Sequence, residues 1–175
     1  NPKFIKIPSA CNNHWEMLQW LCDNYGGEIQ LSLGMTTKTE EEKIIRLFED
    51  KKRNRDLTIY ACTSGYPVAF EDVCLLEITR LRECYEDIVK RIGFSGHHNG
   101  IAIDVAAYTL GAEVFERHFT LDRTWKGTDH AASLEPDGLR RLVRNLNATQ
   151  MSLTYKKDEI LPVEMVQRKK LKYRK

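Results

Sequence analysis

The chain has 175 residues and a formal net charge of +2, and 42% of its residues are hydrophobic and 30% charged. This length and composition suit one globular domain with a sizeable core and exclude a low-complexity or fibrous protein. The net charge is small and no apolar run reaches the length of a membrane span, so we expect neither nucleic-acid nor membrane partners.

Short apolar runs rich in β-branched residues alternate along the chain with longer segments of helical periodicity. In chain order, we predict a strand at 3–8, a helix at 12–24, a strand at 28–33, a helix at 38–52, a strand at 57–63, a helix at 71–82, a strand at 91–95, a helix at 101–110, a strand at 113–119 and a helix at 135–147. Thr39 is the expected N-cap of the second helix, because acidic residues of a first turn follow it.

Five successive strand–helix units indicate a parallel sheet with helices outside it. A doubly wound open sheet and a closed barrel share this pattern, but they differ in where reactive side chains gather. Here every predicted strand ends in polar or reactive residues, which are Lys6 and Ser9, Ser32, Thr63 and Ser64, Ser95 and His97, and Glu116 and His118. This even spread favours a (β/α)8 TIM barrel, of which the chain supplies five units and lacks three.

Two histidines lie at the ends of the fourth and fifth predicted strands, so both are expected at the same mouth of a barrel. His97 and His118 offer neutral imidazoles, which suit transition metals, and two protein ligands leave positions open for water and substrate. The alternative is two unrelated histidines, one capping a helix and one packed in the core. Glu116 shares a strand face with His118. It either handles a proton or a sugar hydroxyl beside a cation, or forms a barrel-layer salt bridge with a lysine such as Lys6.

A lysine charge surrounded by hydroxyls at strand ends is the pattern that a dianionic phosphate requires. The group consists of Lys6, Ser9, Ser32, Ser64 and Ser95. Any one of these serines can instead be an ordinary N-cap. Two segments lie beside the group in the predicted fold. Tyr66 is either a substrate wall or part of a plain turn, and the loop 124–130 either closes over the mouth with Asp129 or is a surface loop.

The five cysteines are scattered and form no CxxC pair. An odd number of isolated cysteines favours reduced thiols over a disulfide framework. No signal peptide is visible, so the expected compartment is the cytoplasm.

Five stretches of the chain, taken in order, resemble the sialic acid synthase family. They are KIPSACNN from Lys6, LSLGMTT from Leu31, ACTSGYP from Ala61, IGFSGHHNGIA from Ile92 and ERHFTLDRTWKGTDHAASLEP from Glu116. The last stretch is long and specific, and its TWKGTDHAASLEP portion is most similar to animal-type members. The resemblance implies that 1–150 is the C-terminal part of a synthase barrel, covering strands four to eight and their helices. It also implies that 151–175 is a linker toward an antifreeze-like (SAF) domain absent from this sequence.

The resemblance implies a metal-assisted, phosphoenolpyruvate-dependent transferase. Such an enzyme joins phosphoenolpyruvate to N-acetylmannosamine or its 6-phosphate with C–O cleavage, giving N-acetylneuraminate or its 9-phosphate and inorganic phosphate. The family's ligands for Mn²⁺ or Mg²⁺ fall on His97 and His118. Its phosphate-binding positions fall on Lys6, Ser9, Ser32 and Ser95, with Ser64 near the phosphoenolpyruvate. Its sugar contacts fall on Tyr66, Glu116 and Asp129, and we expect Glu116 and Asp129 to be the catalytic groups. A homodimer of the full-length enzyme is implied as well.

The sequence departs from the family pattern at three positions. Cys11 stands where the family has an acidic residue, Leu33 replaces a small hydroxyl residue, and His98 replaces Glu or Thr. His98 is expected either as a third metal ligand or as an exposed histidine at a helix start. Because strands one to three and the SAF domain are missing, we expect this chain by itself to be inactive. Two alternatives stay open: a legionaminic- or pseudaminic-type synthase, and a non-catalytic half-barrel scaffold.

Overall fold

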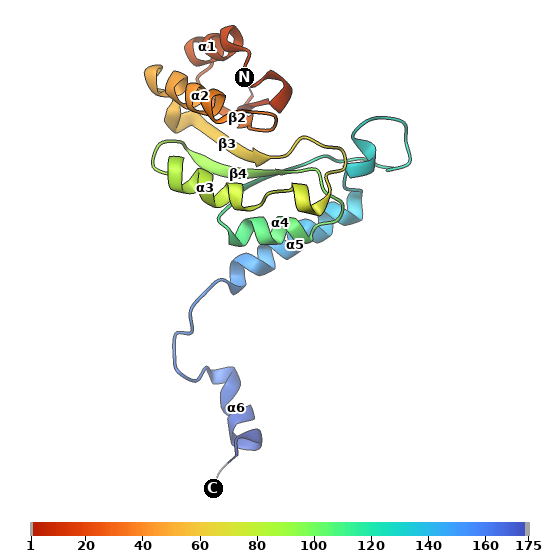
Figure 1. Cartoon of the computed structure of the whole chain (residues 1–175). Coiled ribbons are helices and arrows are strands. Elements are labelled where there is room, and N and C mark those ends of the chain that lie inside the picture. The colour runs from red at the N-terminus through yellow and green to blue at the C-terminus, as the bar shows by residue number, and fades with distance from the viewer. Residues whose placement is uncertain (1, 174–175) are drawn as a thin grey trace.

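The structure is a computed structural model that describes residues 2–173 (Figure 1). Within these residues the strands are β1 (Phe4–Ile7), β2 (Glu28–Ser32), β3 (Leu57–Cys62), β4 (Arg91–Gly96) and β5 (Val114–Arg117). The α-helices are α1 (Trp15–Asn24), α2 (Lys38–Asp50), α3 (Leu76–Tyr85), α4 (Ala102–Thr109), α5 (Pro136–Ser152) and α6 (Pro162–Leu171). No helix in this described part of the chain is long and apolar enough to cross a membrane. Every strand predicted from the sequence is present, so the alternation of strands and helices is confirmed.

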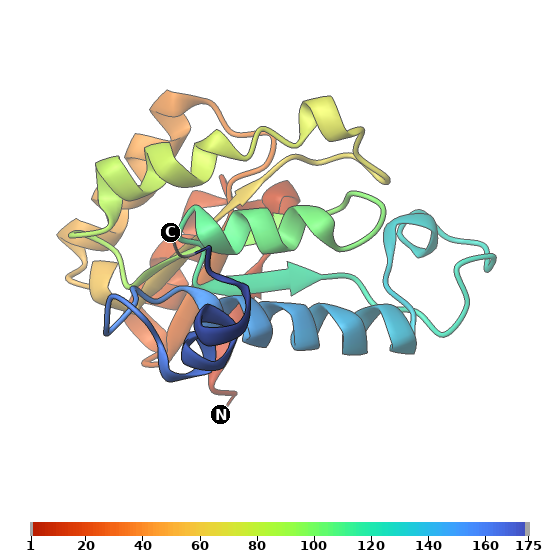
Figure 2. The same cartoon turned by 90° about the horizontal axis from the view of Figure 1, so that it is seen from below.

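The five strands form one parallel sheet whose spatial order equals the chain order, β1-β2-β3-β4-β5. Apolar strand residues such as Leu31, Ile59 and Phe94 are buried in one cluster with helix residues such as Ile44 and Leu81. A doubly wound sheet would instead reverse its strand order and carry helices on both faces. The observed order, with the helices arranged around the outside of the sheet (Figure 2), is that of a partial (β/α)8 barrel. The predicted fold class is therefore confirmed.

A contact across the inner face shows that the sheet curls. Lys6 lies on β1 and Glu116 on β5, the two edge strands, yet Lys6 Nζ is 3.2 Å from Glu116 Oε2. In a flat sheet, four inter-strand spacings would separate these strands by about 19 Å. The edges therefore approach each other as they do in a barrel, and the two long side chains span the remaining interior.

The inner face carries polar side chains, whereas the outer face is mostly apolar. Near the amino ends of the strands, the Glu28 carboxylate accepts hydrogen bonds from Gln30 at 3.0 Å and from Thr58 at 2.9 Å. The same carboxylate forms ion pairs with Lys90 at 2.7 Å and Arg91 at 2.5 Å. Burial acts to raise the pKa of Glu28, but these donors together outweigh it and lower the pKa to about 2.

Acid is expected to destabilise the fold through Glu28. Because its pKa is depressed in the folded state, the stabilisation is complete above the ordinary value of about 4.5 and is lost as the pH falls toward 2. The difference corresponds to about 3 kcal/mol, an upper value because water reaches the open inner face. Denaturant titrations across this pH window should show the free energy of unfolding falling more steeply for the wild type than for Glu28→Gln. Equal slopes would contradict this prediction.

Three helix starts differ from the sequence predictions, and the first is that of α1, which begins at Trp15 instead of residue 12. The N-cap of α2 is Thr37 rather than Thr39. Thr37 Oγ1 accepts from the Glu40 amide at 3.2 Å, and Glu40 Oε2 accepts from the Thr37 amide at 2.9 Å. This reciprocal capping box satisfies two amides at once, which a cap two residues later does not. Helix α3 begins at Leu76 instead of residue 71, because Cys74, with a φ of 52°, interrupts the helical path before it.

The segment 151–175, expected to be a linker, contains helix α6, which lies apart from the barrel units in Figure 1. Glu164 stabilises its start: one carboxylate oxygen accepts from the Leu161 amide at 2.8 Å and the other pairs with Lys156 at 2.8 Å. Pro162 is tolerated in the first turn, where its missing N–H has no partner to lose. The role of this segment as a linker stays a prediction, and its last two residues lie outside the described part of the chain.

Candidate functional site

Three polar side chains meet at the centre of the inner face, near the carboxyl ends of the strands. Lys6 Nζ donates to Ser32 Oγ at 2.8 Å, and Ser32 Oγ donates to Glu116 Oε2 at 3.3 Å. Burial acts to raise the pKa of Glu116. The charge of Lys6 and hydrogen bonds from Ser95, Lys6 and Ser32 outweigh that effect and hold this pKa below its ordinary value. One of the two alternatives predicted for Glu116, a salt bridge with Lys6, is therefore present. This salt bridge lies at the centre of a cluster of side chains from four strands.

A second group of hydroxyls surrounds Gly34, just after β2. Ser9 Oγ accepts from the Gly34 amide at 3.0 Å and lies 3.6 Å from Cys62 Sγ. Ser64 Oγ is buried and has no hydrogen-bond partner among the described residues. A Cβ at position 34 would lie 2.3 Å from Ser64 Oγ and 2.6 Å from Ser9 Oγ, so only glycine allows this approach. The buried hydroxyl without a partner is free to bind an oxygen-rich ligand.

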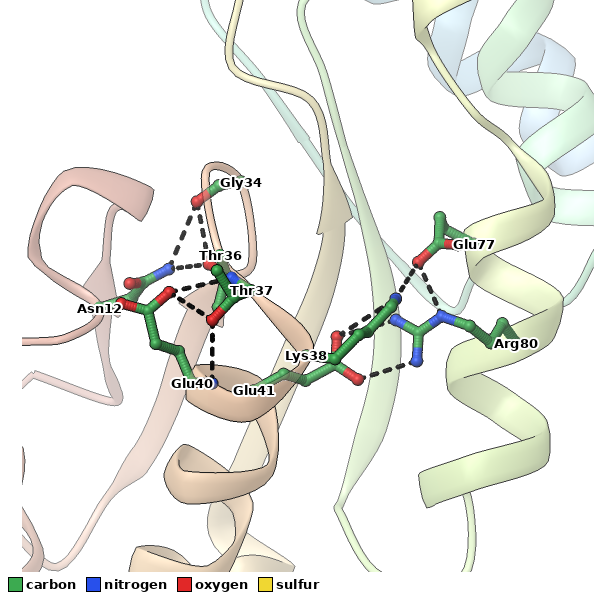
Figure 3. A network of polar contacts seen from close by, with 9 residues as sticks. All are labelled: Asn12, Gly34, Thr36, Thr37, Lys38, Glu40, Glu41, Glu77 and Arg80. Carbon is green, nitrogen blue, oxygen red and sulfur yellow. Dashed lines mark hydrogen bonds and ion pairs between the residues drawn. The ribbon is translucent and has the colours of Figure 1, made fainter.

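Asn12 fixes the loop that carries Gly34 (Figure 3). Its Nδ2 donates to the Ser32 carbonyl at 2.9 Å and to Thr36 Oγ1 at 2.6 Å, and Thr36 Oγ1 donates to the Gly34 carbonyl at 3.0 Å. The Asn12 side chain is buried, and it crosses from the segment after β1 to the segment after β2. The sequence predicted no role for Asn12, although this residue belongs to the stretch KIPSACNN that carried the resemblance.

The two predicted metal ligands face each other at the mouth. The rings of His97 and His118 have centroids 4.9 Å apart and an interplanar angle of 85°. Tyr66 lies against His97 at a centroid distance of 4.6 Å. Burial and the nearby His118 lower the pKa of His97, so its imidazole is neutral at neutral pH. The structure thus brings together residues from the ends of β3, β4 and β5.

The geometry of these imidazoles fits a divalent cation. His97 Nδ1 lies 3.3 Å from the Thr63 carbonyl, and His118 Nδ1 lies 3.7 Å from Asp129 Oδ2. Metal-binding histidines commonly turn one ring nitrogen toward a carbonyl or carboxylate and leave the other for the ion. Among residues 2–173, no group of three or more His, Cys, Asp or Glu side chains is arranged to hold a metal. With one nitrogen of each ring turned toward an oxygen, the other ring nitrogen of His97 and of His118 is the one that would hold an ion.

Asp129 lies on the loop after β5, beside His118. Its side chain is half exposed, and it borders a hollow lined also by His118, Thr128, His130 and Ser133. Thr120 Oγ1 and His130 Nδ1 are 2.8 Å apart, which anchors this end of the loop. The half-exposed carboxylate is therefore available to a ligand in the mouth.

Both expectations for His98 were wrong. Its side chain is 1% exposed and lies on the outer face of the sheet, where Nε2 is 3.2 Å from Asp104 Oδ2. Gly96 allows this position, because a Cβ there would meet the His98 ring at 3.0 Å. The other two departures from the family pattern are also part of the apolar packing: Leu33 is buried in the core, and Cys11 packs against it. No local pattern predicted a role for Asp104, because its partners His98 and Arg117 are not its near neighbours in the chain.

Comparison with known proteins identifies the family of the chain. The model of the NeuB family matches residues 1–158. The chain is 40% identical over 171 residues to the human protein named N-acetylneuraminate-9-phosphate synthase, a match that covers 98% of this chain and 46% of the human one. It is 35% identical over 152 residues to the N,N'-diacetyllegionaminic acid synthase of Campylobacter jejuni, covering 86% of this chain and 44% of that protein.

A solved structure gives the same result. The N-acetylneuraminic acid synthetase of Leptospira borgpetersenii, in complex with citrate, superposes with a TM-score of 0.80 at 31% identity, over 98% of this chain and 59% of that one. The chain thus spans about half the length of the curated relatives that it matches. These relatives are sugar-acid synthases, and the sequence stretches that carried the resemblance lie within the matched region. The chain belongs to the NeuB family.

Proposed function

We propose that the full-length polypeptide carrying this sequence condenses phosphoenolpyruvate with N-acetylmannosamine or its 6-phosphate to give N-acetylneuraminate or its 9-phosphate. The observation that carries the proposal is the convergence of Lys6, Glu116 and the two mouth histidines on one inner face. An ammonium group, hydroxyls, a carboxylate and two imidazoles are the groups that such a reaction requires.

Phosphoenolpyruvate is proposed to bind between the central cluster and the group around Gly34. Lys6 supplies the positive charge, and the hydroxyls of Ser9, Ser32, Ser64 and Ser95 supply donors. Ser64 supports this placement because its buried hydroxyl has no other partner. Binding would transfer Lys6 from the Glu116 carboxylate to the phosphate or carboxylate of the ligand.

The acceptor sugar is proposed to lie toward the two histidines. When bound there, the divalent cation (Mn²⁺ or Mg²⁺) supplies a Lewis acid for the aldehyde of the open-chain sugar. Asp129 is placed to accept hydrogen bonds from sugar hydroxyls, and Tyr66 forms a wall beside His97. Glu116, held ionised by Lys6 and its serine neighbours, is placed to orient a hydroxyl or to move a proton.

The proposed reaction balances as follows. C3 of phosphoenolpyruvate forms a carbon–carbon bond with the aldehyde carbon, and the aldehyde oxygen takes up a proton. Water adds at C2 of the former phosphoenolpyruvate and loses a proton. The C2 hydroxyl oxygen then forms a carbonyl and gives up its proton to the departing phosphate as the C2–O bond to phosphate breaks, so inorganic phosphate leaves with the bridging oxygen.

The test is an assay of the full-length polypeptide with phosphoenolpyruvate labelled with ¹⁸O at the bridging position. We expect release of labelled phosphate only when a divalent cation and N-acetylmannosamine or its 6-phosphate are present, together with a nine-carbon acid detected by mass spectrometry. Comparing the two acceptors decides between the free and the phosphorylated product. Phosphate release without a sugar, or unlabelled phosphate, would contradict the proposal.

Two alternatives are outcomes of the same assay. A 2,4-diacetamido acceptor used in preference would indicate a legionaminic- or pseudaminic-type synthase, which the Campylobacter relative brings into consideration. No turnover with any acceptor would favour the non-catalytic scaffold. Inactivity of the 175-residue chain by itself, the homodimer, the cytoplasmic location and the SAF linker stay predictions.

A further inference from the structure

A buried charge network lies on the outer face of the sheet, directly behind the mouth. Its side chains belong to His98 after β4, Asp104 in α4 and Arg117 in β5, and they are 1%, 0% and 2% exposed. Replacing a buried ion pair by apolar side chains of similar size is often neutral or stabilising. Stability alone therefore gives a poor account of charges in this otherwise apolar layer.

Arg117 connects three pieces of chain through this network. Its Nη1 pairs with Asp104 Oδ2 at 2.5 Å and donates to the Gly100 carbonyl at 3.0 Å. Its Nη2 donates to the His98 carbonyl at 2.8 Å. The planar guanidinium thus holds the segment 97–101 and the start of α4 against the end of β5. A lysine has a single ammonium group and cannot donate to these three acceptors in the same fixed plane.

The network is one residue away from each mouth histidine. Arg117 directly precedes His118, and the carbonyl that it binds belongs to His98, which directly follows His97. Successive residues of a strand point to opposite faces, so Arg117 points outward while Glu116 on the same strand points to the mouth. The backbone that Arg117 holds therefore adjoins both histidines, whose ring centroids are 4.9 Å apart.

We propose that the Asp104–Arg117 pair positions the two-histidine site. Asp104 fixes the guanidinium, and the guanidinium fixes the distance between His97 and His118. The inference rests on the proposed function in one respect, that these imidazoles hold a divalent cation. Both members of the pair are positioning residues, because they act through the backbone of the histidines.

The test compares Mn²⁺ binding by the wild-type full-length polypeptide and two variants. Asp104→Asn keeps the shape of the side chain and removes its charge, whereas Arg117→Lys keeps the charge and removes the fork. Both should raise the Kd for Mn²⁺, followed by electron paramagnetic resonance of the free ion, by about 10- to 100-fold, as seen for residues that orient metal ligands. An unchanged Kd for the folded fraction of both variants would overturn the proposal.

A matched control exists at the Glu41–Arg80 pair between α2 and α3 (Figure 3). Both of its hydrogen bonds are 2.8 Å long, and the Glu41 side chain is 5% exposed. Glu41→Gln removes the buried partner of a partly exposed arginine, at a position far along the chain from the mouth histidines. It should lower stability, as Asp104→Asn does, and leave the Kd for Mn²⁺ unchanged.

A measurement without metal separates this inference from the proposed function. In the metal-free protein, amide hydrogen exchange at residues 97–101 should accelerate in Asp104→Asn and stay slow in Glu41→Gln. Failure of the wild-type protein to bind Mn²⁺ would contradict only the proposed metal site and not the positioning role. Unchanged exchange at 97–101 would contradict the positioning role, whether or not the metal binds.

Discussion

Replacing Lys6 with methionine should reduce turnover of phosphoenolpyruvate by at least about 100-fold in the full-length polypeptide that carries this sequence. Lys6 is the cation at the centre of the inner face. It donates a hydrogen bond to Ser32 at 2.8 Å and forms a salt bridge with Glu116 at 3.2 Å. Its loss removes the charge proposed to neutralise the ligand. Steady-state assays of phosphate release give the measurement.

The same substitution has a second expected effect, on pH dependence. The Lys6 charge helps to hold the pKa of Glu116 below its ordinary value, so Lys6→Met should raise this pKa. The acid limb of the residual activity should then move to higher pH. A shift in this direction would separate the loss of a charge partner from a general loss of folding.

Lys90→Met is the matched control for Lys6. Lys90 also pairs with an inner-face carboxylate, Glu28, at 2.7 Å, but it does so at the amino ends of the strands. This substitution should change stability somewhat and turnover little. Equal losses of turnover in both variants would show that Lys6 has no special role at the mouth.

Replacing both His97 and His118 with alanine should abolish saturable Mn²⁺ binding, measured by calorimetry or paramagnetic relaxation. The two rings face each other with centroids 4.9 Å apart, and no group of three or more potential ligands is arranged for a metal among residues 2–173. Removing both imidazoles therefore leaves the proposed site without its protein ligands. Each single variant should bind the ion more weakly than the wild type.

The control for the histidine variants is His14→Asn. His14 is the N-cap of α1, where its Nδ1 accepts from the Met17 amide at 3.2 Å. Asparagine is also a good N-cap, so the helix should keep its start and Mn²⁺ binding should be unaffected. Saturable binding that persists in the His97→Ala, His118→Ala protein would place the ion elsewhere.

Local patterns were sufficient to predict most of the fold. The alternation of apolar runs with helical periods correctly predicted all five strands of the parallel sheet, and polar residues at every strand end correctly favoured a barrel. The N-cap of α2 was predicted wrongly because two neighbouring threonines are both possible caps. Thr37 replaced Thr39 as a cap because it alone forms a reciprocal box with Glu40.

The sequence by itself also determined which residues reach the mouth, because their places at strand ends follow from chain order. Only the tertiary structure decided how they are paired. Curling of the sheet brings Lys6 to Glu116, which lie on opposite edges, and the absence of a Cβ at Gly34 lets Ser9 and Ser64 approach.

Tertiary structure also decided where His98 lies. The sequence predicted a metal ligand or a surface residue, but His98 is buried beside Asp104. The physical reason is common to these cases. Periodicity along the chain reports which face a residue occupies. Distances between residues far apart in the chain depend on sheet curvature and on buried partners, which no local pattern encodes.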